Sequence, residues 1–125
     1  MMDLNYLDNL LAARAAARFS SLLKKMGKSE ASASSKSNEL FALAIQKGVR
    51  AHLVYMMFRF AKDYLVNYTF KDARIRPWMD NLIRVYALHA LAADMVPLYD
   101  RKAVAAGSGA SLSTALDACL KELRP

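Results

Sequence analysis

The sequence predicts an all-α protein, an antiparallel four-helix bundle in which one long central helix overhangs its neighbours. Apolar residues recur every three or four positions in four segments, polar or glycine-containing stretches separate these segments, and none of them alternates as a strand would. Hydrophobic residues make up 55% of the chain, which holds only 4 Gly and 3 Pro, and such a composition is typical of a folded helical protein. A chain of 125 residues fits one domain, spanning residues 1–125.

The first helix is predicted from Asp3 to about Met26, because leucine, alanine and phenylalanine repeat there at helical spacing. Asp3 suits the N-terminus of the helix, and Gly27 suits its end. Serine occupies half of the positions in residues 28–37, which predicts a flexible loop within the domain.

The second helix is predicted over residues 38–68, a length of roughly 45 Å. Its run at residues 53–58 carries no charge and apolar residues continue beyond it, so the helix is apolar on nearly every side. Such a helix must be covered all round, and a chain of this size has few elements with which to do so. We therefore expect part of the helix to stay exposed unless another domain or subunit meets it. Gly48 indicates either a kink or the close approach of another helix.

The third helix is predicted from Trp78 to about Val96, with Pro77 at its first position and Pro97 ending or kinking it. A glycine-containing turn follows. Ser111 is then expected to cap a last helix, whose apolar stripe includes Cys119.

The net charge of +7 comes from basic residues scattered along the chain, which favours solvated helix faces over a nucleic-acid surface. The longest apolar region includes several Lys and Arg residues and is a poor membrane span. The single cysteine excludes an internal disulfide and fits a reducing compartment.

Few residues suggest chemistry. His52 and His89 lie within predicted helices without the spacing that metal ligands need, so we expect no metal site and interpret both as hydrogen-bonded structural histidines. Asp94 is expected to pair with a basic residue on a facing helix, and Cys119 to be a buried structural thiol. The inventory therefore contains no residue to which a catalytic role can be given, and it argues against an isolated enzyme.

The order of segments resembles the C-terminal helical domain of the acyl-CoA oxidases. The likeness rests on residues 38–65 with their Ala51-His52 pair, on residues 81–88 ending in Tyr-Ala-Leu, and on residues 120–125 ending in Leu-Arg-Pro. The Arg- and Ala-rich residues 12–15 fit the helix that opens this domain in the family. In the family, the flavin site and the catalytic glutamate lie in an upstream dehydrogenase-like core, and the chain continues beyond Arg-Pro. The sequence is accordingly expected to be a fragment, an excised domain or a stand-alone relative.

The resemblance implies a parent enzyme that uses FAD to dehydrogenate acyl-CoA in fatty-acid β-oxidation, with oxygen as the electron acceptor. FAD is expected in the parent and not on this chain alone. The expected partner is the dehydrogenase-like core, in a parent that is a homodimer. The expected location is the peroxisome in a eukaryote, although no targeting tripeptide is present, and the cytoplasm otherwise.

The role expected for this chain is packing and dimerisation. From the all-round apolarity of the second helix, we predict the interface residues to be Tyr55, Met56, Phe58, Phe60 and Trp78. The alternative function, motivated by the net charge, is a stand-alone basic helical adaptor that binds nucleic acid or lipid.

Overall fold

The computed structural model describes residues 3–28, 41–100, 102, 104–105 and 107–124, and every regular element among them is a helix. The helices are α1 (Leu4–Lys28), α3 (Ala42–Asn67), α4 (Ile75–Ala93), α5 (Val96–Asp100) and α6 (Ser108–Leu123). The all-α prediction is confirmed. The predicted loop at 28–37 and the first three residues of the predicted second helix lie outside the described residues, apart from Lys28, which belongs to α1.

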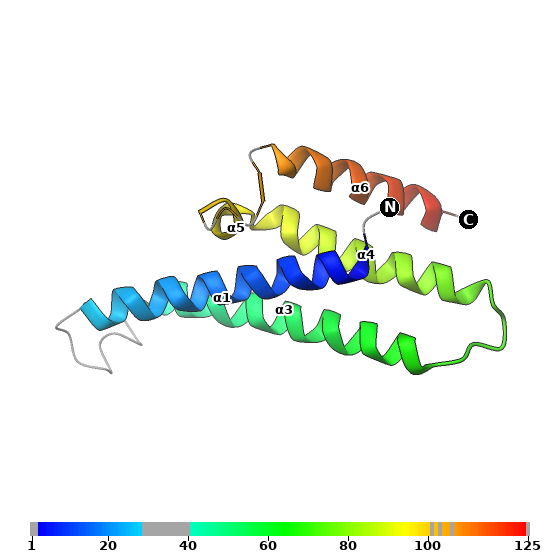
Figure 1. Ribbon diagram of the computed structural model, residues 1–125, viewed down its shortest axis with the longest axis horizontal. Coiled ribbons are helices and arrows are strands. Elements are labelled where there is room, and N and C mark those ends of the chain that lie inside the picture. Colours follow the sequence, from blue (N-terminus) through cyan, green and yellow to red (C-terminus); the bar gives the residue numbers. More distant parts are fainter. Residues whose placement is uncertain (1–2, 29–40, 101, 103, 106, 125) are drawn as a thin grey trace.

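Each long helix runs antiparallel to the long helix before it in the chain (Figure 1). Helices α1 and α3 form an antiparallel pair, α4 lies against both, and α6 packs on α4 (Figure 1). The overhang is shared by two helices, because α1 (25 residues) and α3 (26 residues) both extend beyond the shorter α4 and α6. Helix α1 therefore covers one side of α3 along the overhang.

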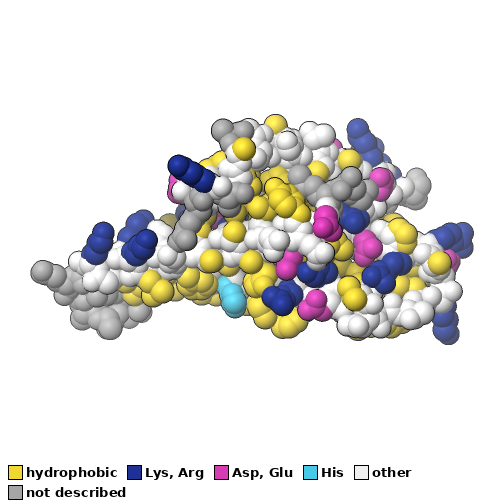
Figure 2. Space-filling view, viewed as in Figure 1, with side chains coloured by type: hydrophobic (Ala, Val, Ile, Leu, Met, Phe, Trp, Pro, Cys, Tyr) yellow, Lys and Arg dark blue, Asp and Glu magenta, His cyan; other side chains and the backbone are white. Residues whose placement is uncertain are grey.

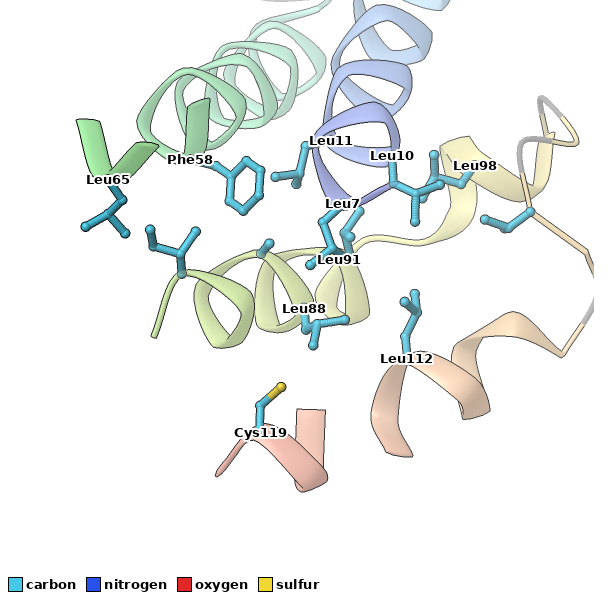
Figure 3. Close-up of a cluster of buried hydrophobic side chains, with 13 residues drawn as sticks. Leu7, Leu10, Leu11, Phe58, Leu65, Leu88, Leu91, Leu98, Leu112 and Cys119 are labelled. Atoms are coloured by element: carbon cyan, nitrogen blue, oxygen red, sulfur yellow. The ribbon is translucent and has the colours of Figure 1, made fainter. Parts of the chain in front are cut away.

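The core lies where α1, α3, α4 and α6 converge (Figure 3). Leu7 and Leu11 of α1 meet Phe58 of α3 and Leu88 and Leu91 of α4, and all five side chains are fully buried. Leu98 of α5 and Leu112 and Cys119 of α6 extend the same cluster. Fully burying a large apolar side chain contributes about 1.5–3 kcal/mol, so this cluster supplies much of the driving force for folding.

The start of α1 agrees with the prediction, whereas the end of α1 and both ends of α4 differ from it. Asp3 caps α1 as predicted, since its Oδ1 accepts a hydrogen bond from the backbone N–H of Asn5 at 3.3 Å. Helix α1 continues to Lys28 and does not end before Gly27. Helix α4 spans Ile75–Ala93, whereas it was predicted from Trp78 to about Val96, and Pro77 is its third residue instead of its first. Pro97 has no N–H to donate to the Ala93 carbonyl, so α4 cannot continue through it.

The last helix begins at Ser108, so the prediction that Ser111 caps it was wrong. Gly107 adopts a left-handed φ of 84° and turns the chain into the helix earlier than expected. The hydroxyl of Tyr99 accepts a hydrogen bond from the Gly109 N–H at 2.9 Å, and so satisfies one donor of the first turn.

Gly48 is a point of close approach between α1 and α3, which was one of its two predicted roles. It is buried, and the ring of Phe19 would lie 3.4 Å from a Cβ atom added there. A side chain larger than that of alanine at this position would push the two helices apart.

Candidate functional site

The first candidate site is an exposed apolar surface on α3 and α4, here called the outer apolar face. On α3, hydrophobic side chains repeat at intervals of three or four residues and therefore share one side of the helix. The same spacing recurs on α4. The face consists of Val49, Leu53, Met57, Phe60 and Tyr64 on α3 and Ile75, Trp78, Leu82 and Tyr86 on α4.

A side-chain contact joins the two halves of this face. The hydroxyl of Tyr86 lies 3.7 Å from the Sδ atom of Met57, which spans the seam between α4 and α3. Phe60 is 64% exposed and Trp78 is 48% exposed. Hydrophobic side chains also gather along the edge of the molecule formed by α3 (Figure 2). The opposite side of α3 carries Phe58 into the core, so the helix is apolar on two sides, as its sequence indicates.

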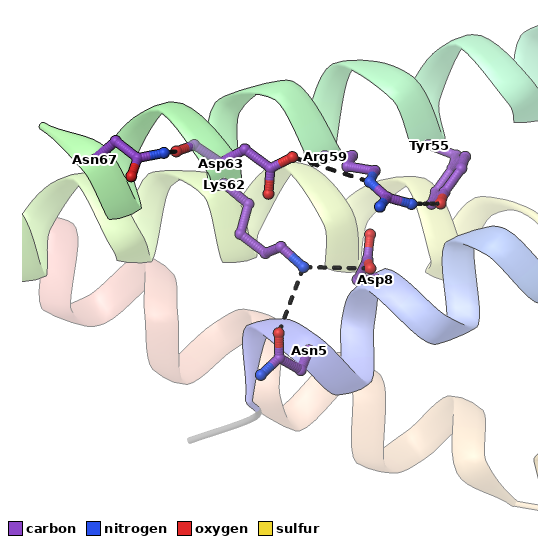
Figure 4. Close-up of polar contacts among 7 residues, drawn as sticks. All are labelled: Asn5, Asp8, Tyr55, Arg59, Lys62, Asp63 and Asn67. Carbon is purple, nitrogen blue, oxygen red and sulfur yellow. Dashed lines mark hydrogen bonds and ion pairs between the residues drawn. The ribbon is translucent and has the colours of Figure 1, made fainter.

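The five predicted interface residues do not lie together. Phe60 and Trp78 belong to the outer apolar face, and Met56, which is partly buried, borders its α3 half. Tyr55 instead lies near the ion pair that joins Lys62 of α3 to Asp8 of α1 at 3.2 Å (Figure 4). Its hydroxyl accepts a hydrogen bond from Arg59 at 2.7 Å. Phe58 is fully buried within this chain, so the prediction that it contacts a partner was wrong.

The exposed residues that the prediction missed could have been identified from their spacing in the sequence. The exposed residues are spaced three or four positions apart and include Phe60 together with Val49, Leu53, Met57 and Tyr64. The predicted set was instead chosen from the uncharged run of consecutive residues. Consecutive residues point in different directions around a helix. The exposed surface is therefore formed by residues at helical spacing, and not by the consecutive uncharged residues 53–58.

The second candidate site is a basic groove between α1, α3 and α4, here called the inner groove. Its volume is about 290 Å³. Arg14 and Arg18 enter it from α1, and Lys47 and Arg50 enter it from α3. Asp94, at the end of α4, is its one acidic lining residue among those described. A groove with four cations and one carboxylate has a strong positive potential.

Arg18 and Asp94 form a two-point ion pair across the groove, which confirms the predicted pairing of Asp94 with a facing helix. The Nε of Arg18 donates to Oδ2 of Asp94 at 3.2 Å, and its Nη2 donates to Oδ1. Such a bidentate arrangement fixes both side chains in position. The carboxylate is thereby engaged by Arg18.

Arg14 is the unusual cation of this groove, because it is only 3% exposed. Its Nη1 donates to the Ala90 carbonyl at 2.5 Å, whereas its Nε is buried without a hydrogen-bond partner. Burial lowers the pKa of Arg14, Asp94 opposes that shift, and the positive charge of Arg18 adds to it. A buried charge without its own counterion is energetically costly.

A wider groove lies beside the inner one, towards the overhanging ends of α1 and α3, and is called the outer groove. Its volume is about 660 Å³. The two grooves share Arg18 and Lys47. The outer groove adds Lys24, Lys25 and Asp100 together with apolar side chains such as Leu22 and Val96.

The residues singled out for chemistry have structural surroundings. Both histidines are exposed, and the ring of His52 lies 6.1 Å from that of Phe19, so the prediction of hydrogen-bonded structural histidines was wrong. Cys119 is buried as predicted, and burial raises the pKa of its thiol, an effect that Arg84 partly offsets. In the described part of the chain, no three His, Cys, Asp or Glu side chains are grouped as metal ligands.

Two of the family-like segments meet in space. Asn81 is buried on α4, and its Nδ2 donates to Oε2 of Glu122 on α6 at 2.8 Å. Arg84 donates to Oδ1 of the same asparagine at 3.0 Å. Residues 81–88 and 120–124 thus form one contact between α4 and α6, so the likeness in sequence corresponds to a packing unit.

Fold and site together define an all-α domain that leaves an apolar face on α3 and α4 exposed. The chain belongs to the acyl-CoA oxidase family, whose family model matches residues 3–125. No match was found among the curated proteins, and none among the solved structures. None of the helices formed by the described residues is long and apolar enough to cross a membrane.

Proposed function

We propose that this chain is the C-terminal helical domain of an FAD-dependent acyl-CoA oxidase, and that its outer apolar face packs on the dehydrogenase-like core. The observation that carries the proposal is the exposed stripe on a helix that is already buried on its other side. Large exposed apolar patches mark interaction surfaces. Burying Phe60 or Leu53 against a partner would contribute about 1.5–3 kcal/mol per side chain.

FAD is assigned by this proposal to the upstream core. The grooves of the described residues offer cations, but they hold no carboxylate facing an enclosed apolar cavity, which acyl-CoA dehydrogenation would need as a base. The groove residues that the structure describes therefore do not fit the site of a flavin reaction. The function of the chain is structural: it binds the core and extends the subunit contact of a homodimer. The proposal includes a role in fatty-acid β-oxidation, in the peroxisome if the host is a eukaryote.

The proposal is tested on the isolated chain by dye binding and sedimentation. The wild-type chain should bind a hydrophobic dye such as anilinonaphthalene sulfonate and self-associate as its concentration rises. The double variant Leu53→Gln/Phe60→Gln should lose most of both signals. Leu23→Gln/Leu120→Gln is the matched control, because it removes two exposed leucines outside the outer apolar face. A dispersed monomer that folds cooperatively and binds no dye would refute the docking role.

A second measurement uses the polypeptide from its native source. Its mass should be well above the 13.9 kDa of this chain. Hydroxyl-radical footprinting should then show Met57 and Trp78 protected in the intact protein and reactive in the isolated chain. Equal reactivity of both residues in the two samples would contradict the proposed packing.

A further inference from the structure

The inner and outer grooves together concentrate much of the positive charge of the molecule at one place. Six basic side chains line them against two carboxylates, a surplus of four positive charges in a chain whose net charge is +7. In the sequence these residues are scattered over α1 and α3, and the antiparallel pairing of the two helices brings them together. A concave surface of one sign of charge attracts and concentrates small ions of the opposite sign.

Arg14 is the basic residue of these grooves that most needs a further partner. It lines the inner groove, it is almost fully buried, and its Nε lacks a hydrogen-bond partner. Asp94 is already held at two points by Arg18. An added anion would therefore supply an acceptor for the unpaired Nε and a second negative charge beside a guanidinium that shares Asp94 with Arg18.

We propose that the inner groove binds a phosphate group of a small phosphorylated molecule, with Arg14, Lys47 and Arg50 as its ligands. Guanidinium groups match the oxygens of phosphate in geometry, and charge-assisted hydrogen bonds to them are about twice as strong as neutral ones. The outer groove, which combines Lys24 and Lys25 with apolar side chains, accommodates the rest of the molecule. This site is independent of the outer apolar face, and the inference does not rest on the proposed function.

The shape of the groove favours a small molecule over nucleic acid or a membrane. Duplex DNA and lipid bilayers present broad surfaces that contact protruding Lys and Arg side chains. Arg14 lies recessed between α1 and α4, bonded to the Ala90 carbonyl, where such a surface cannot reach it. A single phosphate or diphosphate group can enter a groove of about 290 Å³.

The test measures the binding of inorganic pyrophosphate to the 125-residue chain by calorimetry, at constant ionic strength. Saturable binding with a stoichiometry of one is expected. The variant Lys47→Gln/Arg50→Gln should bind at least about tenfold more weakly, a difference of about 1.4 kcal/mol. Lys71→Gln/Lys121→Gln is the matched control, since it removes two exposed lysines outside both grooves and lowers the net charge by the same amount. Its affinity should stay within about twofold of the wild type.

An amide and guanidinium NMR spectrum tests the part played by Arg14. Its Nε–H resonance, assigned by its loss in Arg14→Lys, should shift on addition of pyrophosphate, and adenosine diphosphate should produce the same shift. The absence of saturation, or an equal loss of affinity in both double variants, would overturn the proposal. Binding to duplex DNA or phosphatidylserine vesicles without any response to pyrophosphate would overturn it as well, in favour of a macromolecular partner.

Discussion

At the scale of single residues, α3 carries two phenylalanines only two positions apart with opposite surroundings. Phe58 is fully buried in the core between α1 and α4, and Phe60 is mostly exposed on the outer apolar face. Both are phenylalanines of the same apolar segment, and only Phe60 shares the three- or four-residue spacing of the exposed stripe. Their difference comes from the direction in which each side chain leaves the helix.

The two phenylalanines make a matched pair for a stability measurement. Phe58→Ala should lower the free energy of unfolding by about 3–5 kcal/mol, because it opens a cavity in the core. Phe60→Ala should change it by less than about 0.5 kcal/mol in the isolated chain, because this side chain is exposed. Urea denaturation followed by circular dichroism measures both. Similar losses of stability for the two variants would contradict the assignment of Phe58 to the buried face of α3 and Phe60 to its exposed face.

The buried thiol of Cys119 makes stability depend on pH. Burial raises the pKa of this thiol in the folded state, so the unfolded chain releases its proton first as the pH rises. The stabilising contribution is therefore complete below the unfolded pKa of about 8.5 and declines above it. The stability advantage of the wild type over Cys119→Ala should therefore shrink as the pH rises from 7 to 9.5. A difference that stays constant over this range in urea titrations would show that the thiol is hydrated.

At the scale of elements, the α1 and α3 pair depends on the small residue at its crossing. Gly48 faces the ring of Phe19 at a distance that a single Cβ atom can occupy. Alanine is favoured over glycine in helices by up to about 1 kcal/mol. Gly48→Ala should therefore raise the free energy of unfolding by about 0.5–1 kcal/mol.

Gly48→Leu is the informative contrast, since its side chain would strike Phe19 and should lower the stability by about 1–3 kcal/mol through overpacking. Both variants are compared with the wild type by thermal unfolding. A destabilised alanine variant would mean that the two helices approach each other more closely than the structure shows.

At the scale of the whole molecule, burial is unevenly distributed among the helices. Helix α6 packs mainly on α4, and its buried residues are Leu112 and Cys119, whereas α1 contributes seven buried residues. Elements with few buried contacts open locally at low free energy. Backbone amides of α6 should thus exchange with deuterium well before those in the middle of α1 and α4, as measured by mass spectrometry. Equal protection of α6 and α1 would show one cooperative unit.

Much of the secondary structure was predictable, because helical periodicity is a local property of the sequence. The four long helices were predicted near their observed positions, and the pairing of Asp94 with a facing helix was predicted correctly. The helix ends were predicted less accurately. The last helix begins earlier than the serine signal at Ser111 indicated, because Gly107 turns the chain into it with a left-handed φ. The buried place of Arg14 was not predicted, because it depends on α4 lying across α1.

The sequence by itself determined that the chain is helical, that α3 is too apolar to be covered by a small domain alone, and that its motifs resemble the acyl-CoA oxidase family. Only the tertiary structure decided which apolar residues remain exposed and which basic residues share a groove. The physical reason is that periodicity fixes the faces of each helix, whereas the packing of α1 and α4 against α3 selects which of those faces water can reach.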